Sequence, residues 1–182
     1  MTTLAGAAGI TGSVDGTGSA ARFANEMGMA ADSVGSIYVA DQANHTIRKL
    51  NLAGEVGTVA GRAGYSGSAD GIGSNARFRW PYGIAIDRSG NLYVADTFNH
   101  TIRKITSASE VSTVGGMAGI SGSADGEGSN SRFNQPWGVA VDSLGNLYVA
   151  DTANNSIRKG VSLTARAQFT SLDFTAGGLP RP

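Results

Sequence analysis

A repeat of 55 residues constrains this chain more than any other feature of its sequence. The segments VADQANHTIRKL, VADTFNHTIRKI and VADTANNSIRKG begin at Val39, Val94 and Val149, so the period is 55 residues at both steps. No insertion disturbs this register. A fixed period of such a size is typical of stacked or radially arranged structural units, each of which packs against the next.

Each repeat contains four runs that favour β-strands. GIAID (residues 83–87) and NLYVAD (91–96) are apolar or β-rich and are separated by the turn-forming link RSG. TIRKI (101–105) alternates apolar and charged residues, and VSTVGG (111–116) follows a polar link. Four antiparallel strands make a β-propeller blade, with the first strand innermost and the fourth at the rim. We therefore expect an all-β fold with three blades in residues 1–160.

A long glycine-rich loop joins each repeat to the next, as in residues 117–138. Its glycines permit positive φ angles, and its proline prepares the chain for the following strand. In each copy the loop carries a phenylalanine at an equivalent position, Phe23, Phe78 or Phe133. We expect a turn of helix here whose phenylalanine fills the gap between neighbouring blades.

These motifs together resemble the NHL-repeat family, whose members form β-propellers. The resemblance rests on GNLYVAD in the second and third copies, on its variant at residues 35–41, and on IRK in all three copies. It also rests on the Asn-His pairs that end at His45 and His100. The third copy departs from the pattern, because Asn155 stands where the others carry histidine.

Three blades cannot close a propeller, because closed rings have about 4 to 8 blades. Residues 1–6, MTTLAG, align with the fourth-strand residues 56–61 and 111–116, and the last repeat ends after its third strand. We expect a homodimer in which residues 1–6 of each chain complete the partner's third blade, giving a six-bladed ring. A piece of a longer propeller and a different multimer are the alternatives. Residues 161–182 form a non-repeat C-terminal tail whose QFTSLDF run alternates like a strand and is an alternative candidate for the vacant rim position.

Composition excludes several classes of partner. The 14 Lys and Arg residues balance 14 Asp and Glu, so no net charge favours nonspecific binding to nucleic acid or to an anionic membrane. The absence of cysteine excludes disulfides and thiolate metal sites. No apolar run approaches the roughly 18 residues of a membrane span, and the first residues lack the basic region of a signal peptide. We expect a soluble protein and leave its compartment open.

Polar residues recur in the turn after the second strand of each blade, on the face that surrounds one mouth of the central channel. The recurring pairs are Asp41 with Arg48, Asp96 with Arg103, and Asp151 with Arg158. We expect each aspartate to accept hydrogen bonds from turn amides or to pair with the nearby arginine. This structural role is the first reading of the motif.

A metal site is the second reading. Catalytic zinc uses three protein ligands and one open position, and a dimer would bring four histidines to one mouth. Resemblance to six-bladed propeller enzymes implies His45 and His100 as ligands of a divalent metal such as zinc, manganese or calcium. It also implies a catalytic role for Asp41 or Asp96 in orienting a metal-bound water. Turn formation by the histidines is the alternative.

Aromatic residues gather mainly in the second copy, at positions where the repeats differ. These candidate ligand-binding residues are Trp80, Tyr82, Phe98 and Trp137. They predict an apolar rim suited to a small ligand, since such sites are mostly hydrophobic. Packing between blades is the alternative for both tryptophans.

Two functions follow. The first is a scaffold that binds a small molecule, protein, peptide or glycan on the face bearing the long loops. The second is a metal-dependent hydrolase of esters, lactones or phosphotriesters at the channel mouth.

Overall fold

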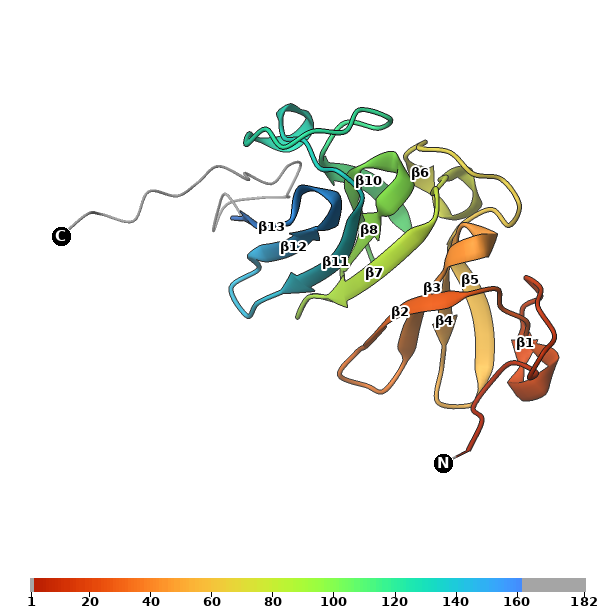
Figure 1. Cartoon of the computed structure of the whole chain (residues 1–182). Coiled ribbons are helices and arrows are strands. Elements are labelled where there is room, and N and C mark those ends of the chain that lie inside the picture. Colours follow the sequence, from red (N-terminus) through yellow and green to blue (C-terminus); the bar gives the residue numbers. More distant parts are fainter. Residues whose placement is uncertain (1, 162–182) are drawn as a thin grey trace.

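Three antiparallel sheets follow one another along the chain in a computed structural model, which describes residues 2–161 (Figure 1). The first sheet contains β2 (Glu26–Ala31), β3 (Ile37–Asp41), β4 (Thr46–Leu50) and β5 (Glu55–Gly61). The second contains β7 (Pro81–Ile86), β8 (Leu92–Asp96), β9 (Thr101–Ile105) and β10 (Glu110–Gly115). The third contains β11 (Pro136–Val141), β12 (Leu147–Asp151) and β13 (Ser156–Gly160). These strands confirm the blades predicted from the repeat.

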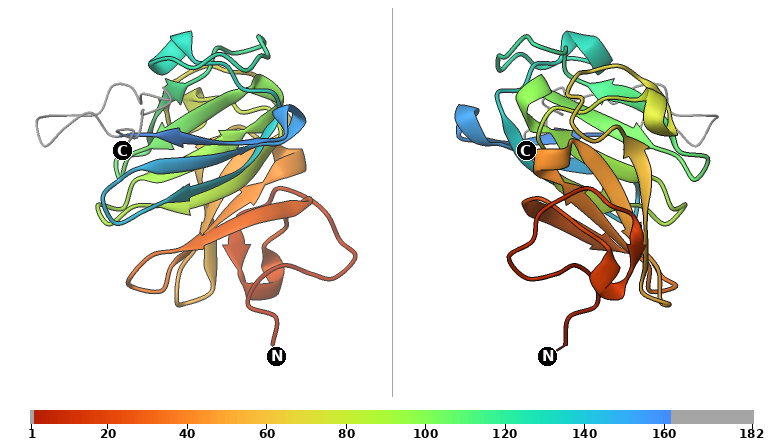
Figure 2. Two further views of the ribbon diagram at one scale, coloured as in Figure 1. Left: turned by 60° about the vertical axis from the view of Figure 1, so that its left-hand side comes forward. Right: turned by 90° about the vertical axis from the view of Figure 1, so that its right-hand side faces the viewer.

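Adjacent sheets pack through their first strands, because β7 contacts both β2 and β11 (Figure 2). The apolar core accordingly lies between sheets. Ile47 of the first sheet joins a buried cluster with Val94 of the second, and Ile102 of the second sheet joins another with Val149 of the third. Each blade therefore depends on its neighbours for burial of its faces.

The first two sheets have a fifth strand that the sequence did not predict. β1 (Gly16–Thr17) pairs with the rim strand β5, and β6 (Gly71–Ile72) pairs with the rim strand β10. These two-residue strands come from the long loops, for which we expected no strand. The loop returns along the outer edge and pairs with backbone groups that an open edge would leave unpaired.

Each long loop also forms a short 3₁₀ helix. The three helices are η1 (Gly18–Ala20), η3 (Gly73–Asn75) and η5 (Gly128–Asn130). Phe78 and Phe133, which follow the last two, are fully buried. A Cβ atom on Gly61 would lie 3.2 Å from the Phe78 ring, and one on Gly116 would lie 3.1 Å from the Phe133 ring. These contacts with the preceding blade confirm the predicted filling of the gap.

Two ends of the repeat region bear on the ring prediction. Residues 2–6 form no strand within the single chain, and β13 is the last strand of the third sheet in the described residues. The proposed pairing between these segments of two copies is not tested. Most of the tail, residues 162–182, lies outside the described residues. No helix within residues 2–161 has the length and apolar character to cross a membrane.

Candidate functional site

Three tight turns and the starts of three first strands form one edge of the molecule, which we call the mouth. The turns are η2 (Gln42–Asn44), η4 (Thr97–Asn99) and η6 (Thr152–Asn154). Strand pairing brings each turn beside the start of the first strand in its own blade, for example Pro81 opposite Asp96. Within each blade, the turn and the end of the long loop thus lie at the same end of the sheet, as predicted, while their placement around a channel mouth stays a prediction.

The residue that closes each turn has a left-handed backbone conformation. The φ angles are 60° at His45, 59° at His100 and 53° at Asn155. Asparagine and histidine are enriched in this region among residues other than glycine. Asn155 therefore replaces histidine in the third copy without a change in the turn.

A buried aspartate stabilises each turn. Asp96 is fully buried and accepts hydrogen bonds from the Arg79 backbone N–H at 2.7 Å, from Asn99 Nδ2 at 2.7 Å and from the Arg103 guanidinium at 2.8 Å. Asp41 makes the equivalent bonds to Ala24, Asn44 and Arg48, and Asp151 to Asn134, Asn154 and Arg158. This geometry agrees with the structural reading of the motif.

Arg103 extends this network to the long loop. Its guanidinium also pairs with Asp70 at 2.6 Å and lies 5.1 Å from the centre of the Phe78 ring. Burial raises the pKa of Asp96 to about 6, although Arg103 and the backbone hydrogen bond act in the opposite direction. Asp96 is still ionised at neutral pH. With both of its oxygens engaged, a catalytic role for Asp96, as for Asp41, stays a prediction.

The two histidines link neighbouring blades. His45 Nδ1 accepts a hydrogen bond from the Trp80 backbone N–H at 3.3 Å, and His100 Nδ1 accepts one from the Gln135 N–H at 3.0 Å. Burial and, next, the Arg79 charge lower the pKa of both histidines. Both rings are therefore neutral at neutral pH. Because Nδ1 accepts, the proton of each ring lies on Nε2.

This tautomer does not fit a metal ligand. A histidine that binds a metal through Nε2 normally donates its Nδ1–H to a second group, whereas here Nδ1 is the acceptor. Within residues 2–161, no three histidine, aspartate or glutamate side chains gather where they could hold a metal ion. Metal binding by His45 and His100 stays a prediction, and no catalytic step is derived from it.

The four predicted ligand-binding aromatics form two pairs. Trp80 and Phe98 have ring centres 5.8 Å apart, and Tyr82 stacks on Trp137 at 4.9 Å. Trp80, Phe98 and Trp137 are 39%, 36% and 46% exposed, so packing between blades does not bury them. The Trp80 ring also lies 6.1 Å from the His45 ring of the preceding blade. Their binding role stays a prediction.

Arg79 is a mouth residue that the sequence reasoning missed. It is exposed and directly precedes Trp80. Its charge lowers the pKa of both histidines, which indicates that it lies near them. The repeat carried a usable signal, because the equivalent residues are Ala24 and Asn134.

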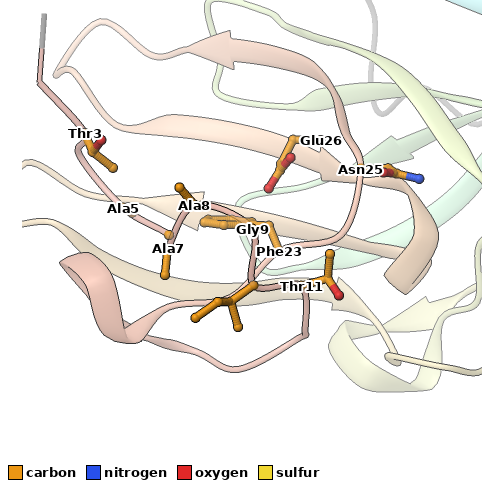
Figure 3. Close-up of a pocket in the computed structure, with 11 residues that line it drawn as sticks. Thr3, Ala5, Ala7, Ala8, Gly9, Thr11, Phe23, Asn25 and Glu26 are labelled. Carbon is orange, nitrogen blue, oxygen red and sulfur yellow. The ribbon is translucent and has the colours of Figure 1, made fainter.

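A separate pocket of about 420 Å³ lies on the open side of the first blade (Figure 3). Thr3 and residues 5–11 form one wall, and Phe23, Asn25 and Glu26 form the other. This pocket has no counterpart among the predicted site residues. Phe78 and Phe133, the equivalents of Phe23, are covered by a preceding blade.

Comparison with known proteins gives relatives of the same architecture. The NHL repeat matches residues 78–105 and 133–159. NHL repeat-containing protein 2 of Bos taurus is 34% identical over 153 residues, covering 76% of this chain but only 21% of the relative.

Two solved structures resemble the fold. A structural genomics protein from Bacteroides thetaiotaomicron has 29% identity and a TM-score of 0.62, with 69% of this chain and 32% of that chain covered. An auxiliary nutrient binding protein from Bacteroides ovatus has 23% identity and a TM-score of 0.64, with coverages of 79% and 38%.

Proposed function

Because this chain is an NHL-repeat protein, we propose that it is a binding scaffold whose mouth holds the ligand and whose ring is completed by a second copy. The observation that carries the binding role is the exposed aromatic set at the mouth. The fold does not require these side chains, since blade one carries Asn25 and Ala43 where blade two carries Trp80 and Phe98.

Three equivalent glycines support a further blade beyond the third. A Cβ atom on Gly28 would lie 2.3 Å from the carbonyl oxygen of Tyr82, and one on Gly83 would lie 2.4 Å from that of Trp137. Only glycine allows a neighbouring backbone this close. Gly138 occupies the same position in the third blade, yet the nearest atom is the Ala150 Cβ at 3.4 Å. A following blade would give Gly138 the contact its equivalents have.

The burial of equivalent side chains also supports a neighbouring blade on both open sides of the chain, beyond the third blade and before the first. Ile47 and Ile102 are fully buried between blades, whereas their equivalent Ile157 is 74% exposed. On the opposite side, Met29 is 69% exposed while its equivalent Ile84 is only 7% exposed. The two open faces are different halves of one junction, so copies can join head to tail and close as a ring.

Residues 2–6 support the predicted exchange of strands. A Cβ atom on Gly6 would lie 3.4 Å from the Phe23 ring, and the equivalent distance from Gly61 to Phe78 is 3.2 Å. The Gly6 N–H also donates to the Gly18 carbonyl at 3.0 Å, as the Gly116 N–H does to Gly128 at 3.1 Å. This segment thus lies where the rim strand of a preceding blade would end. Two chains of three blades would make six.

The binding role is tested by screening arrays of peptides and glycans and titrating the hits. The chain has two tryptophans, Trp80 and Trp137, and both lie at the mouth, so intrinsic fluorescence reports on this site directly. We expect hits to change the emission and to bind Trp80→Asn more weakly. Leu52→Ala is the control, because Leu52 is an 81% exposed apolar residue in the turn between β4 and β5, at the opposite end of β4 from η2. Hits that bind Trp80→Asn and the parent chain equally would contradict the proposal.

The metal-dependent hydrolase is the second hypothesis from the sequence. No observation in residues 2–161 favours it, because both histidines use Nδ1 as an acceptor and no metal-binding group of three is present there. Elemental analysis of chelator-free protein tests it: stoichiometric zinc or manganese that is lost in His100→Ala would revive it.

A further inference from the structure

The second blade differs from its neighbours at three adjoining mouth positions. Arg79, Trp80 and Phe98 stand where the first blade has Ala24, Asn25 and Ala43, and where the third has Asn134, Gln135 and Ala153. The turn and its buried aspartate form in all three blades. The cation and the two aromatic rings are therefore additions to a turn that is stable without them.

Backbone contacts hold these residues together. The Arg79 carbonyl accepts a hydrogen bond from the Phe98 N–H at 3.2 Å, and the Trp80 N–H donates to His45 at 3.3 Å. The Trp80 ring is tilted by 54° against the Phe98 ring. The Trp80 and Phe98 rings thus lie beside Arg79, whose backbone is held by the turn of the second blade.

The Arg79 side chain has no carboxylate partner within residues 2–161. It is exposed, and no acidic side chain lies within ion-pair distance. The aspartates nearest this part of the mouth are already engaged: Asp96 pairs with Arg103, and Asp151 pairs with Arg158. The neighbouring imidazoles are neutral and carry a proton on Nε2. The local surface therefore combines one positive charge with hydrogen-bond donors.

Trp80 occupies a backbone conformation that does not suit a large side chain. Its φ is 55°, and the equivalent residues Asn25 and Gln135 have φ angles of 55° and 49°. A bulky residue at positive φ is a genuine outlier, and such strain tends to be retained at functional sites. Here the strained residue also leaves 39% of its surface exposed, where a ligand can reach it.

We propose that Arg79, Trp80 and Phe98 bind a ligand that carries a carboxylate beside an apolar ring. The guanidinium pairs with the carboxylate, for which its planar donors are suited, and the two aromatic side chains contact the ring. This inference rests on the proposed binding function and names the class of ligand. A free aryl acid and a peptide that ends in an aromatic residue share this chemistry.

Three small probes test the inference. Phenylacetate and phenylacetamide have the same ring and differ in charge, whereas N-acetylphenylalanine presents the same groups at the end of a peptide bond. Binding is measured by tryptophan fluorescence and by ligand-observed NMR on the full chain. We expect the two acids to bind about tenfold more tightly than the amide, the scale of a hydrogen bond to a charged group.

The variants follow the other blades. Arg79→Asn introduces the residue of the third blade, and we expect it to remove the preference for the acids while leaving weak ring binding. Trp80→Asn introduces the residue of the first blade and should abolish binding of all three probes. Arg88→Asn is the control, because Arg88 is also exposed but lies in the turn between β7 and β8, at the opposite end of β7 from Trp80.

The outcomes separate this inference from the proposed function. Tighter binding of N-acetylphenylalanine than of phenylacetate supports a peptide terminus, and the reverse supports a free aryl acid. Equal binding of phenylacetate and phenylacetamide overturns the anionic class but keeps the aromatic binding site. Failure of all three probes also overturns it, while peptide and glycan hits that depend on Trp80 would still support the scaffold.

Discussion

Ile157 provides the sharpest test of ring closure by a second copy. The side chain is 74% exposed in the single chain, whereas Ile47 and Ile102 at the equivalent positions are fully buried against the next blade. Replacing Ile157 with aspartate leaves the interior of one chain untouched. In the proposed ring, however, it introduces a charge into each of two junctions.

The expected magnitude follows from the difference in burial. Full burial of an isoleucine side chain is worth about 1.5–3 kcal/mol, so covering the exposed 74% of Ile157 contributes about 1–2 kcal/mol per junction. Two junctions contribute about 2–4 kcal/mol, which is roughly 30-fold to 1,000-fold in the dissociation constant. An unpaired buried carboxylate costs several further kcal/mol. Ile157→Asp should therefore be monomeric at about micromolar concentration.

Light scattering and sedimentation equilibrium measure the outcome. The parent chain should have twice the mass of one chain, and Ile157→Val, which keeps an apolar surface, should remain dimeric. Circular dichroism should show the same β-sheet content in all three proteins, because the substituted site is exposed in each chain. A dimer that persists in Ile157→Asp, or a monomeric parent, would refute the reasoning from the open faces.

Two further predictions concern stability. Because burial lowers the pKa of His45 and His100 from 6.5, the unfolded chain binds more protons than the native one just below pH 6.5. The contribution of these histidines to the free energy of unfolding therefore decreases as the pH is lowered through this range. Asp96, with its pKa raised to about 6, has the opposite effect on the pH dependence of stability. Urea denaturation of the parent chain and of a variant with both histidines replaced by asparagine, each at several pH values, isolates the contribution of the histidines. Identical pH slopes for the two proteins would contradict this prediction. Gly83→Ala should cost about 1–3 kcal/mol of unfolding free energy because its Cβ would lie 2.4 Å from a carbonyl oxygen of the third blade. Gly57→Ala, where no atom lies within 4 Å, is the control, and equal losses in both variants would contradict the close approach.

The sequence was most informative where the repeat combined with local strand patterns. The main strands of the second blade could be placed because LYVAD is rich in residues that favour strands and TIRKI alternates apolar and charged residues. The pairing of Asp96 with Arg103 could be anticipated for a similar reason. The two residues lie diagonally across one hairpin, because Arg103 is opposite Val94 and Asp96 is opposite Thr101, so a single local motif contains both partners.

Non-local contacts were harder to predict. The added outer strands β1 and β6 are two residues long and consist of Gly-Thr and Gly-Ile, which carry no strand pattern of their own. The role of His100 as an acceptor from the Gln135 N–H depends on how two blades pack, and the sequence of the turn that contains His100 does not indicate this contact. Arg79 could have been found by comparing the copies, because only the second has a charge at that position.

The two junctions between blades use the same contacts. In each, a carbonyl oxygen of the following blade lies close to a glycine of the preceding blade, and a backbone N–H of the following blade donates to the histidine that closes the preceding turn. Such a junction does not distinguish a blade on the same polypeptide from one on another molecule. In a covalent propeller the last junction forms at a fixed effective concentration, whereas in the proposed ring it forms at the concentration of free chains. Dilution alone should then open the ring, so the six-bladed form would persist only above the dissociation constant of the dimer.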